Sequence, residues 1–153
     1  MEAIVAALAA VIALLAWRAQ RTHNRLSVRP FPTIGLLSLG DRMKITVMNN
    51  GIGPMRILSL RFVDAEGASH ANVLKVVSTK RGVGIVSMDD AAIAPNRRRT
   101  LFKLNHRPDT AHGEMDRTAQ ELARHKIVME YTDVYGTKFP PYIRDLSFFL
   151  DDS

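Results

Sequence analysis

The sequence predicts a mainly β protein, in which an N-terminal transmembrane helix precedes an antiparallel β sandwich with one short helix. Three observations lead to this fold class. The segment from Ala3 to Trp17 carries no charged side chain, short apolar runs alternate with turn residues after Pro32, and 153 residues suffice for one domain. Cysteine is absent, which excludes disulfides, thiolate metal sites and cysteine nucleophiles.

The segment from Ala3 to Trp17 is apolar on every face, whereas an amphipathic surface helix needs a polar side. As a helix it reaches about 22 Å, short of the ~30 Å hydrocarbon core, although flanking side chains extend the reach and a thinned bilayer would accommodate it. We therefore predict a transmembrane helix over residues 1–19. The alternatives are a cleavable signal peptide, which needs a basic start, and a buried core helix, which needs an apolar coat on all sides.

Basic residues follow this helix and predict its orientation. The membrane-anchoring candidates are Trp17, Arg18, Arg21, Arg25 and Arg29. Residues 20–32 read as a basic juxtamembrane linker that lies against anionic head groups and ends in a stiff Pro-Phe-Pro exit. The positive-inside rule then places residues 33–153 in the cytoplasm, on the inner face of a cell inner membrane, with a periplasmic domain as the alternative.

Alanines in the predicted helix stand four residues apart on one face. Ala6 pairs in this way with Ala10, and Ala9 with Ala13. Small side chains let a second helix approach closely, so this face predicts a homo-oligomer or docking beside a partner's helix.

Beyond Pro32, alternating apolar and polar residues predict strands with one buried face. A loop over 80–84, a turn at Pro95-Asn96 and turns at 64–67 and 133–136 separate them. The predicted strands are 33–39, 42–49, 55–64, short pieces at 73–77 and 85–88, a piece at 92–94, then 100–104, 127–131 and 143–150, with a helix over 115–125.

Two of the connecting loops have a physical explanation in their residues. Gly51 and Gly53 are expected to supply positive φ in the loop that precedes Pro54. Asp133 is expected to hydrogen-bond the backbone of a turn that Gly136 ends. Both loops are therefore predicted to be turn architecture without a ligand.

The loop Asn49-x-Gly51-x-Gly53-Pro54, the Pro95-Asn96 turn and the segment Tyr131-x-Asp133-x-x-Gly136 occur together in this order. In this set the sequence resembles small bacterial proteins in which one membrane helix precedes an immunoglobulin-like β sandwich. The resemblance covers roughly residues 33–150 and implies that fold. Because those proteins mostly have no assigned activity, it implies no functional residues.

No chemistry is predicted from the side chains: no catalytic, cofactor-binding or metal-ligating residue, and no cofactor. The five histidines are scattered, with only a loose pair at His106 and His112. Two adjacent carboxylate pairs, Asp89-Asp90 and Asp151-Asp152, point to opposite faces if extended and read as solvated turn and tail.

Arg97, Arg98 and Arg99 are the one charge cluster that stands out, in a chain with 21 basic and 15 acidic residues. They are placed between the Pro-Asn turn and the next strand. A solvated strand end, or contact with lipid or a protein partner, is expected ahead of nucleic acid, because aromatic residues amount to only 7% and fall in strand patterns.

These observations predict a non-enzymatic, membrane-anchored subunit that acts as adaptor or scaffold for a protein partner, with edge strands suited to strand addition. The alternative is an oligomerising effector, in which the alanine-rich helices permeabilise the bilayer and the sandwich serves as sensor or assembly domain.

Overall fold

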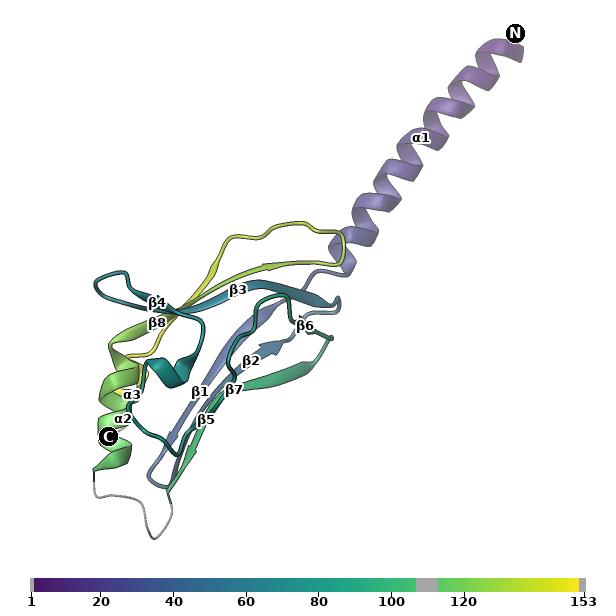
Figure 1. Ribbon diagram of the computed structural model, residues 1–153. Helices are drawn as coiled ribbons and strands as arrows, with labels where there is room; N and C mark the ends of the chain where they lie inside the picture. Colours follow the sequence, from purple (N-terminus) through teal and green to yellow (C-terminus); the bar gives the residue numbers. More distant parts are fainter. Residues whose placement is uncertain (1, 107–112, 152–153) are drawn as a thin grey trace.

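The computed structural model describes residues 2–106 and 113–151, which form one long helix and two antiparallel sheets (Figure 1). Helix α1 (Glu2–Ser27) projects away from the sheets. Helices α2 (Glu114–Ala123) and α3 (Phe148–Asp151) lie at the opposite end of the β domain. The predicted mainly β fold class is confirmed.

The strands divide into two sheets of defined order. The first sheet has the order β1-β2-β7-β5, and the second has the order β4-β3-β8-β9, with the short β6 paired to β3. Their bounds, together with the 3-10 helix η1, are β1 (Pro32–Leu39), β2 (Arg42–Asn49), β3 (Met55–Asp64), β4 (Ser69–His70), η1 (Val73–Lys75), β5 (Val83–Gly84), β6 (Ala92–Ile93), β7 (Arg97–Asn105), β8 (His125–Thr132) and β9 (Tyr142–Asp145).

The core lies between the sheets and follows the alternation in the sequence. Every second residue of β2 from Met43 to Asn49 is buried, and Ile127 and Met129 of β8 face them from the other sheet. Leu122 of α2 and Phe149 of α3 are completely buried and close the end of the core remote from α1. The two sheets thus form one continuous apolar interior, the usual source of stability in a domain of this size.

Helix α1 runs to Ser27, which is beyond the end of the apolar segment. Residues 18–27 are polar but contain good helix formers, and the first residue that cannot continue a helix is Pro30. Ser27 Oγ donates a hydrogen bond to the carbonyl oxygen of Asn24, 3.0 Å away, in the last turn. Polarity therefore marks the end of the apolar segment but not the end of the helix, and most of the predicted linker is helical.

All side chains of α1 are exposed, so the alternative of a buried core helix is wrong. Within the described residues, α1 is the one helix with the length and apolar composition to cross a membrane, with a mean hydropathy of 1.9 in its most apolar window.

Several sequence-based boundaries are wrong for local reasons. Residues 73–75 form η1 and not a strand, because the Asn72 side chain accepts a hydrogen bond from the backbone N–H of Leu74 and caps a helical turn. The short strand expected at 85–88 lies instead at Val83–Gly84. Strand β7 begins three residues earlier than predicted, because Arg97–Arg99 pair with β2.

The last predicted strand, 143–150, ends at Asp145. The Asp145 carboxylate accepts a hydrogen bond from the backbone N–H of Ser147 at 2.7 Å, and this turn starts α3. The short helix predicted over 115–125 is α2, which ends at Ala123. The helices η1 and α3 are short helices that were not predicted.

Candidate functional site

The junction between α1 and the sheets is organised by the side chain of Asn49, which is completely buried at the end of β2. Its Oδ1 accepts hydrogen bonds from the backbone N–H of Phe31 (3.2 Å) and of Gly51 (3.0 Å). Its Nδ2 donates to the carbonyl oxygens of Gly53 (2.8 Å) and Ile93 (3.1 Å). One amide thus joins the exit from α1, the β2–β3 loop and β6.

The β2–β3 loop approaches the segment after α1 so closely that side chains are excluded. A Cβ on Gly53 would lie 1.7 Å from the carbonyl oxygen of Val28, and a Cβ on Gly51 would lie 2.4 Å from the backbone nitrogen of Phe31. The glycines with positive φ are Gly67, Gly113 and Gly136, so the expectation of positive φ at Gly51 and Gly53 is wrong. These two glycines are required by the close approach of two backbones.

The turn between β8 and β9 is built as predicted, and it brings aromatic side chains to α1. Oδ1 of the buried Asp133 accepts hydrogen bonds from the backbone N–H groups of Tyr135 (2.8 Å) and Thr137 (2.9 Å), and Gly136 has a φ of 76°. Figure 1 shows the connection between β8 and β9 reaching the C-terminal end of α1.

Three of the predicted anchoring arginines stack on aromatic rings. The guanidinium carbon of Arg21 lies 5.4 Å from the ring centroid of Trp17, one turn earlier in α1. The corresponding distances are 5.4 Å from Arg25 to Tyr135 and 4.9 Å from Arg29 to Phe139. Because Tyr135 and Phe139 belong to the β8–β9 connection, the Arg25 contact ties α1 to the second sheet, and the Arg29 contact ties the segment after α1 to it.

A groove of about 370 Å³ lies between α1 and the β8–β9 turn. Tyr135 forms one wall, and five residues of a single helix face, three and four apart, form the other. These helix residues are Trp17, Gln20, Arg21, Asn24 and Arg25. Within the described residues, no carboxylate lies within 4.0 Å of the guanidinium nitrogens of Arg21 or Arg25.

Burial raises the pKa of Tyr131, and the nearby charge of Arg29 opposes that rise. The Tyr131 ring stacks on Phe139 at a centroid distance of 5.3 Å, so Arg29, Phe139 and Tyr131 form one layered contact beside the junction. Because its pKa is raised, the phenol of Tyr131 is neutral near pH 7, and the Tyr131 side chain serves to pack the junction.

Arg97, Arg98 and Arg99 are exposed but do not share a face. Arg97 and Arg99 pair with Asn49 and Val47 of β2, whose side chains point inward, whereas Arg98 pairs with Met48 on the outer face. The pairing of Arg97 with Asn49 places the cluster at the end of the domain that adjoins α1. The structure gives no test of its predicted contact with lipid or a partner.

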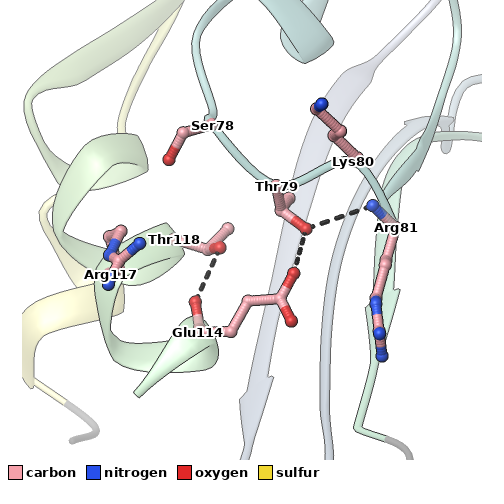
Figure 2. A pocket seen from close by; sticks show the side chains of 7 residues that line it. All are labelled: Ser78, Thr79, Lys80, Arg81, Glu114, Arg117 and Thr118. Atoms are coloured by element: carbon pink, nitrogen blue, oxygen red, sulfur yellow. Dashed lines mark hydrogen bonds between the residues drawn. The ribbon is translucent and has the colours of Figure 1, made fainter. Parts of the chain in front are cut away.

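A second cavity lies between α2 and the loop after η1, and polar side chains there hold the two together (Figure 2). Thr79 donates a hydrogen bond to the Glu114 carboxylate at 2.5 Å, and Thr118 donates to the Glu114 carbonyl oxygen at 2.9 Å. The backbone N–H and the hydroxyl of Ser78 both donate to the Glu121 carboxylate. The two carboxylates therefore clamp the loop to α2, which is a structural role.

The adjacent carboxylates of Asp89 and Asp90 point to different arginines of β3. Arg61 makes a bidentate pair with Asp89 at 2.6 and 2.9 Å, and Arg56 pairs with Asp90 at 2.9 Å. The hydrogen bonds from Arg61 lower the pKa of Asp89 and raise that of Arg61. Both carboxylates therefore fasten the segment before β6 to the second sheet.

Within residues 2–106 and 113–151, no group of three His, Asp or Glu side chains has the arrangement to hold a metal ion. His112 of the loose histidine pair and the side chains of Asp151 and Asp152 lie outside the described residues.

Comparisons with known proteins give little. No protein-family model matches the chain, and neither does any curated protein. The X-ray structure of Northeast Structural Genomics Consortium target SoR45 is similar over 78% of this chain and 86% of that chain, with 18% sequence identity and a TM-score of 0.26.

Sequence reasoning found the arginines of this region but missed Tyr135, Phe139 and the buried Asn49. Each contact of these residues with the helix exit joins positions far apart in the sequence. The one local signal was the pair of aromatic residues in an otherwise polar turn region.

Proposed function

We propose that the chain is a non-enzymatic, single-pass membrane protein, and that its domain presents the edge of β1 to a protein partner on the inner face of a bacterial inner membrane. The observation that carries this proposal is a strand edge, unpaired from Leu36 to Leu39, on a domain joined to an apolar helix. The long apolar helix and the arginines after Trp17 support the anchoring and its orientation.

Strand β1 ends the order of the first sheet, and within the described residues no strand pairs with its outer edge. The backbone N–H of Ile34 donates to the phenol oxygen of Tyr142 at 3.4 Å and therefore points away from β2. Because alternate residues of an edge strand point the same way, the N–H groups of Leu36 and Ser38 also face outward. These donors support strand addition by an extended partner segment.

Side chains beside this edge indicate the chemistry of the partner. Leu37 and Leu39 are 38% and 45% exposed on the outer face of β1. An extended segment with apolar side chains at every second position would cover them while its backbone pairs with β1.

We also propose that the domain is immunoglobulin-like, as the sequence resemblance implies. If β1, β2, β3, β5, β7, β8 and β9 are equated with strands A to G, the sheet orders become A-B-E-D and C-F-G, with the two-residue strands β4 and β6 as additions beside strand C. This is the strand order of the constant-type immunoglobulin sandwich, and it supports the assignment.

The adaptor proposal is tested with the full chain in its membrane, carrying a photo-crosslinking residue at Leu39, whose side chain is exposed on the outer face beside the edge. We expect a discrete adduct with one protein, and we expect Leu36→Pro to abolish it, since proline removes an outward donor from an edge strand. A crosslinker at the exposed Lys103 of β7 is the matched control. An adduct that survives Leu36→Pro, or that forms only at Lys103, would argue against the β1 edge as the contact.

The alternative, an oligomerising effector, has one observation in its favour. The alanine face of α1, which includes Ala6, Ala10 and Ala13, is exposed along its length and free to meet a second helix. Dye release from vesicles by the full chain, but not by a chain that begins at Leu26, would support the effector. Equal release by both chains would exclude the helix as its cause.

A further inference from the structure

We propose that the groove between α1 and the β8–β9 turn binds the phosphate of an anionic phospholipid head group. The inference rests on the membrane anchoring proposed above and is independent of the protein partner. Its basis is the groove lined by Trp17, Gln20, Arg21, Asn24, Arg25 and Tyr135.

The two arginines are held beside the groove by cation–π contacts. The guanidinium carbon lies 5.4 Å from a ring centroid in each case, Arg21 over Trp17 and Arg25 over Tyr135. A guanidinium presents its N–H groups in one plane, so it can donate to two oxygens of one phosphate. No described carboxylate is within 4.0 Å of either guanidinium, so their positive charges are not neutralised by ion pairs.

The Arg21 end of the groove matches the depth of the head-group layer. With Trp17 at the edge of the hydrocarbon core, Arg21 and Arg25 lie about 6 and 12 Å further along the helix axis. The head-group layer is roughly 5 to 8 Å thick on each side. The phosphate of a lipid would therefore meet Arg21 directly. Arg25 and the Tyr135 ring beside it lie about 4 Å or more beyond this layer, and the long Arg25 side chain would reach back to the phosphate.

The helix face below the groove explains why a lipid is favoured over a soluble phosphate. At 3.6 residues per turn, the groove face continues from Trp17 through Ala13 and Ala10 to Ala6. This track is apolar, narrow and exposed, and an acyl chain attached to a phosphate in the groove would lie along it. Gln20 and Asn24 add neutral donors and acceptors for head-group hydroxyls, whereas an ammonium group would meet two arginines.

Trp17 provides the measurement, because it is the only tryptophan in the chain. The full chain is placed in zwitterionic phosphatidylcholine vesicles that contain a small fraction of one brominated lipid, either phosphatidylglycerol or phosphatidylcholine. Bromine quenches tryptophan only at short range. We expect phosphatidylglycerol to quench at several-fold lower mole fraction than phosphatidylcholine. The preference is the ratio of the mole fractions of the two brominated lipids that quench equally. We expect the double variant Arg21→Gln, Arg25→Gln to lower this ratio about fivefold or more, because each basic residue near the surface contributes about a fivefold effect.

The matched comparison is between the single variants Arg21→Gln and Arg18→Gln, because each removes one positive charge and only Arg21 lines the groove. Each variant is judged by its own ratio of the two lipids, so a change in Trp17 emission after loss of its stacking partner cancels. Tyr135→Ala should weaken the preference without changing the charge. A loss of preference in Arg18→Gln as large as in Arg21→Gln would overturn the site, leaving a diffuse charge effect.

Two further outcomes separate the sources of the effect. Inorganic phosphate at millimolar concentration should not displace the brominated lipid, and displacement would overturn a lipid as the occupant. Extraction of the chain from the vesicles by alkaline carbonate would overturn the anchoring and the site together. Retention of the chain with equal quenching by both lipids would overturn the site alone.

Discussion

Asn49 makes the junction depend on one side chain, because its two acceptor bonds and two donor bonds end on four backbone groups from three different segments. A buried backbone group left without a partner costs roughly 1 to 3 kcal/mol. The neighbouring Asn50 is exposed and makes one side-chain hydrogen bond, to Thr33 at 2.9 Å. The two asparagines therefore form a natural pair for comparison.

We expect Asn49→Ala to lower the free energy of unfolding by about 3 kcal/mol or more, because four backbone groups, three of them in buried hydrogen bonds, lose their partner together. Asn50→Ala should lower it by less than about 1 kcal/mol. Urea unfolding of the full chain in detergent, followed by near-ultraviolet circular dichroism, measures both. Similar losses in the two variants would contradict the assigned role of Asn49.

Gly53→Ala should lower the melting temperature markedly, because the new Cβ would overlap the Val28 carbonyl oxygen and push the β2–β3 loop away from the helix exit. Gly40→Ala is the control, since a Cβ there meets nothing within 4 Å. Calorimetry of the full chain in detergent gives both values. An unchanged melting temperature in Gly53→Ala would show that the two backbones are not in contact.

Stability should fall in acid through Asp89. The hydrogen bonds from Arg61 lower the pKa of Asp89 in the folded state, so this contribution is fully present above the unfolded pKa of about 3.9 and is lost as pH falls through the lower folded value. Melting temperatures between pH 7 and pH 2 should fall more steeply in the parent chain than in Asp89→Asn. Because the pair is partly exposed, the difference is at most about 1 kcal/mol. If the melting temperature fell equally with decreasing pH in both chains, the pair of Asp89 and Arg61 would not be a source of the acid sensitivity.

At the scale of elements, local alternation predicted β1, β2 and β3 to within one residue and β8 to within two, because each has one face in the core. The errors came where another part of the chain decides the outcome. Strand β7 is extended back to Arg97 by pairing with β2, and α1 continues past Trp17 because no helix-breaking residue intervenes. Arg25 and Arg29 could be singled out from charge as anchoring candidates, whereas their aromatic partners Tyr135 and Phe139, more than one hundred residues away, could not be predicted.

Changing Arg97, Arg98 and Arg99 together to Glu should weaken the association of the domain with anionic vesicles, and the effect should shrink as salt rises. The melting temperature should stay nearly unchanged, because all three side chains are exposed and none forms an ion pair among the described residues. Flotation of a chain that begins at Leu26 with phosphatidylglycerol vesicles measures the association. A fall in melting temperature would instead assign these side chains to the fold.

At the scale of the whole molecule, the arginines after Trp17 predict a domain on the cytoplasmic side. A reporter that is active only in the periplasm, fused after Ser153, should be inactive, and a reporter active only in the cytoplasm should be active at the same position. The reverse pair of results would place the domain outside the cytoplasm and show that the positive-inside argument fails here.

The helix is continuous from Trp17 to Ser27, so the number of residues in this segment sets the rotation of the domain about the helix axis. Tyr135 contacts Arg25 in the last turns of α1, and Asn49 and Phe139 contact Phe31 and Arg29 just after it, so we expect the domain to turn with the helix. Each residue inserted after Trp17 would rotate the domain by about 100° about the helix axis and move it about 1.5 Å further from the membrane. A seven-residue insertion would nearly restore the original rotation, with the domain about 10 Å further from the membrane. The length of the helix therefore sets the direction in which the β1 edge faces. A partner fixed in the same bilayer could pair with this edge only over a narrow range of domain rotation.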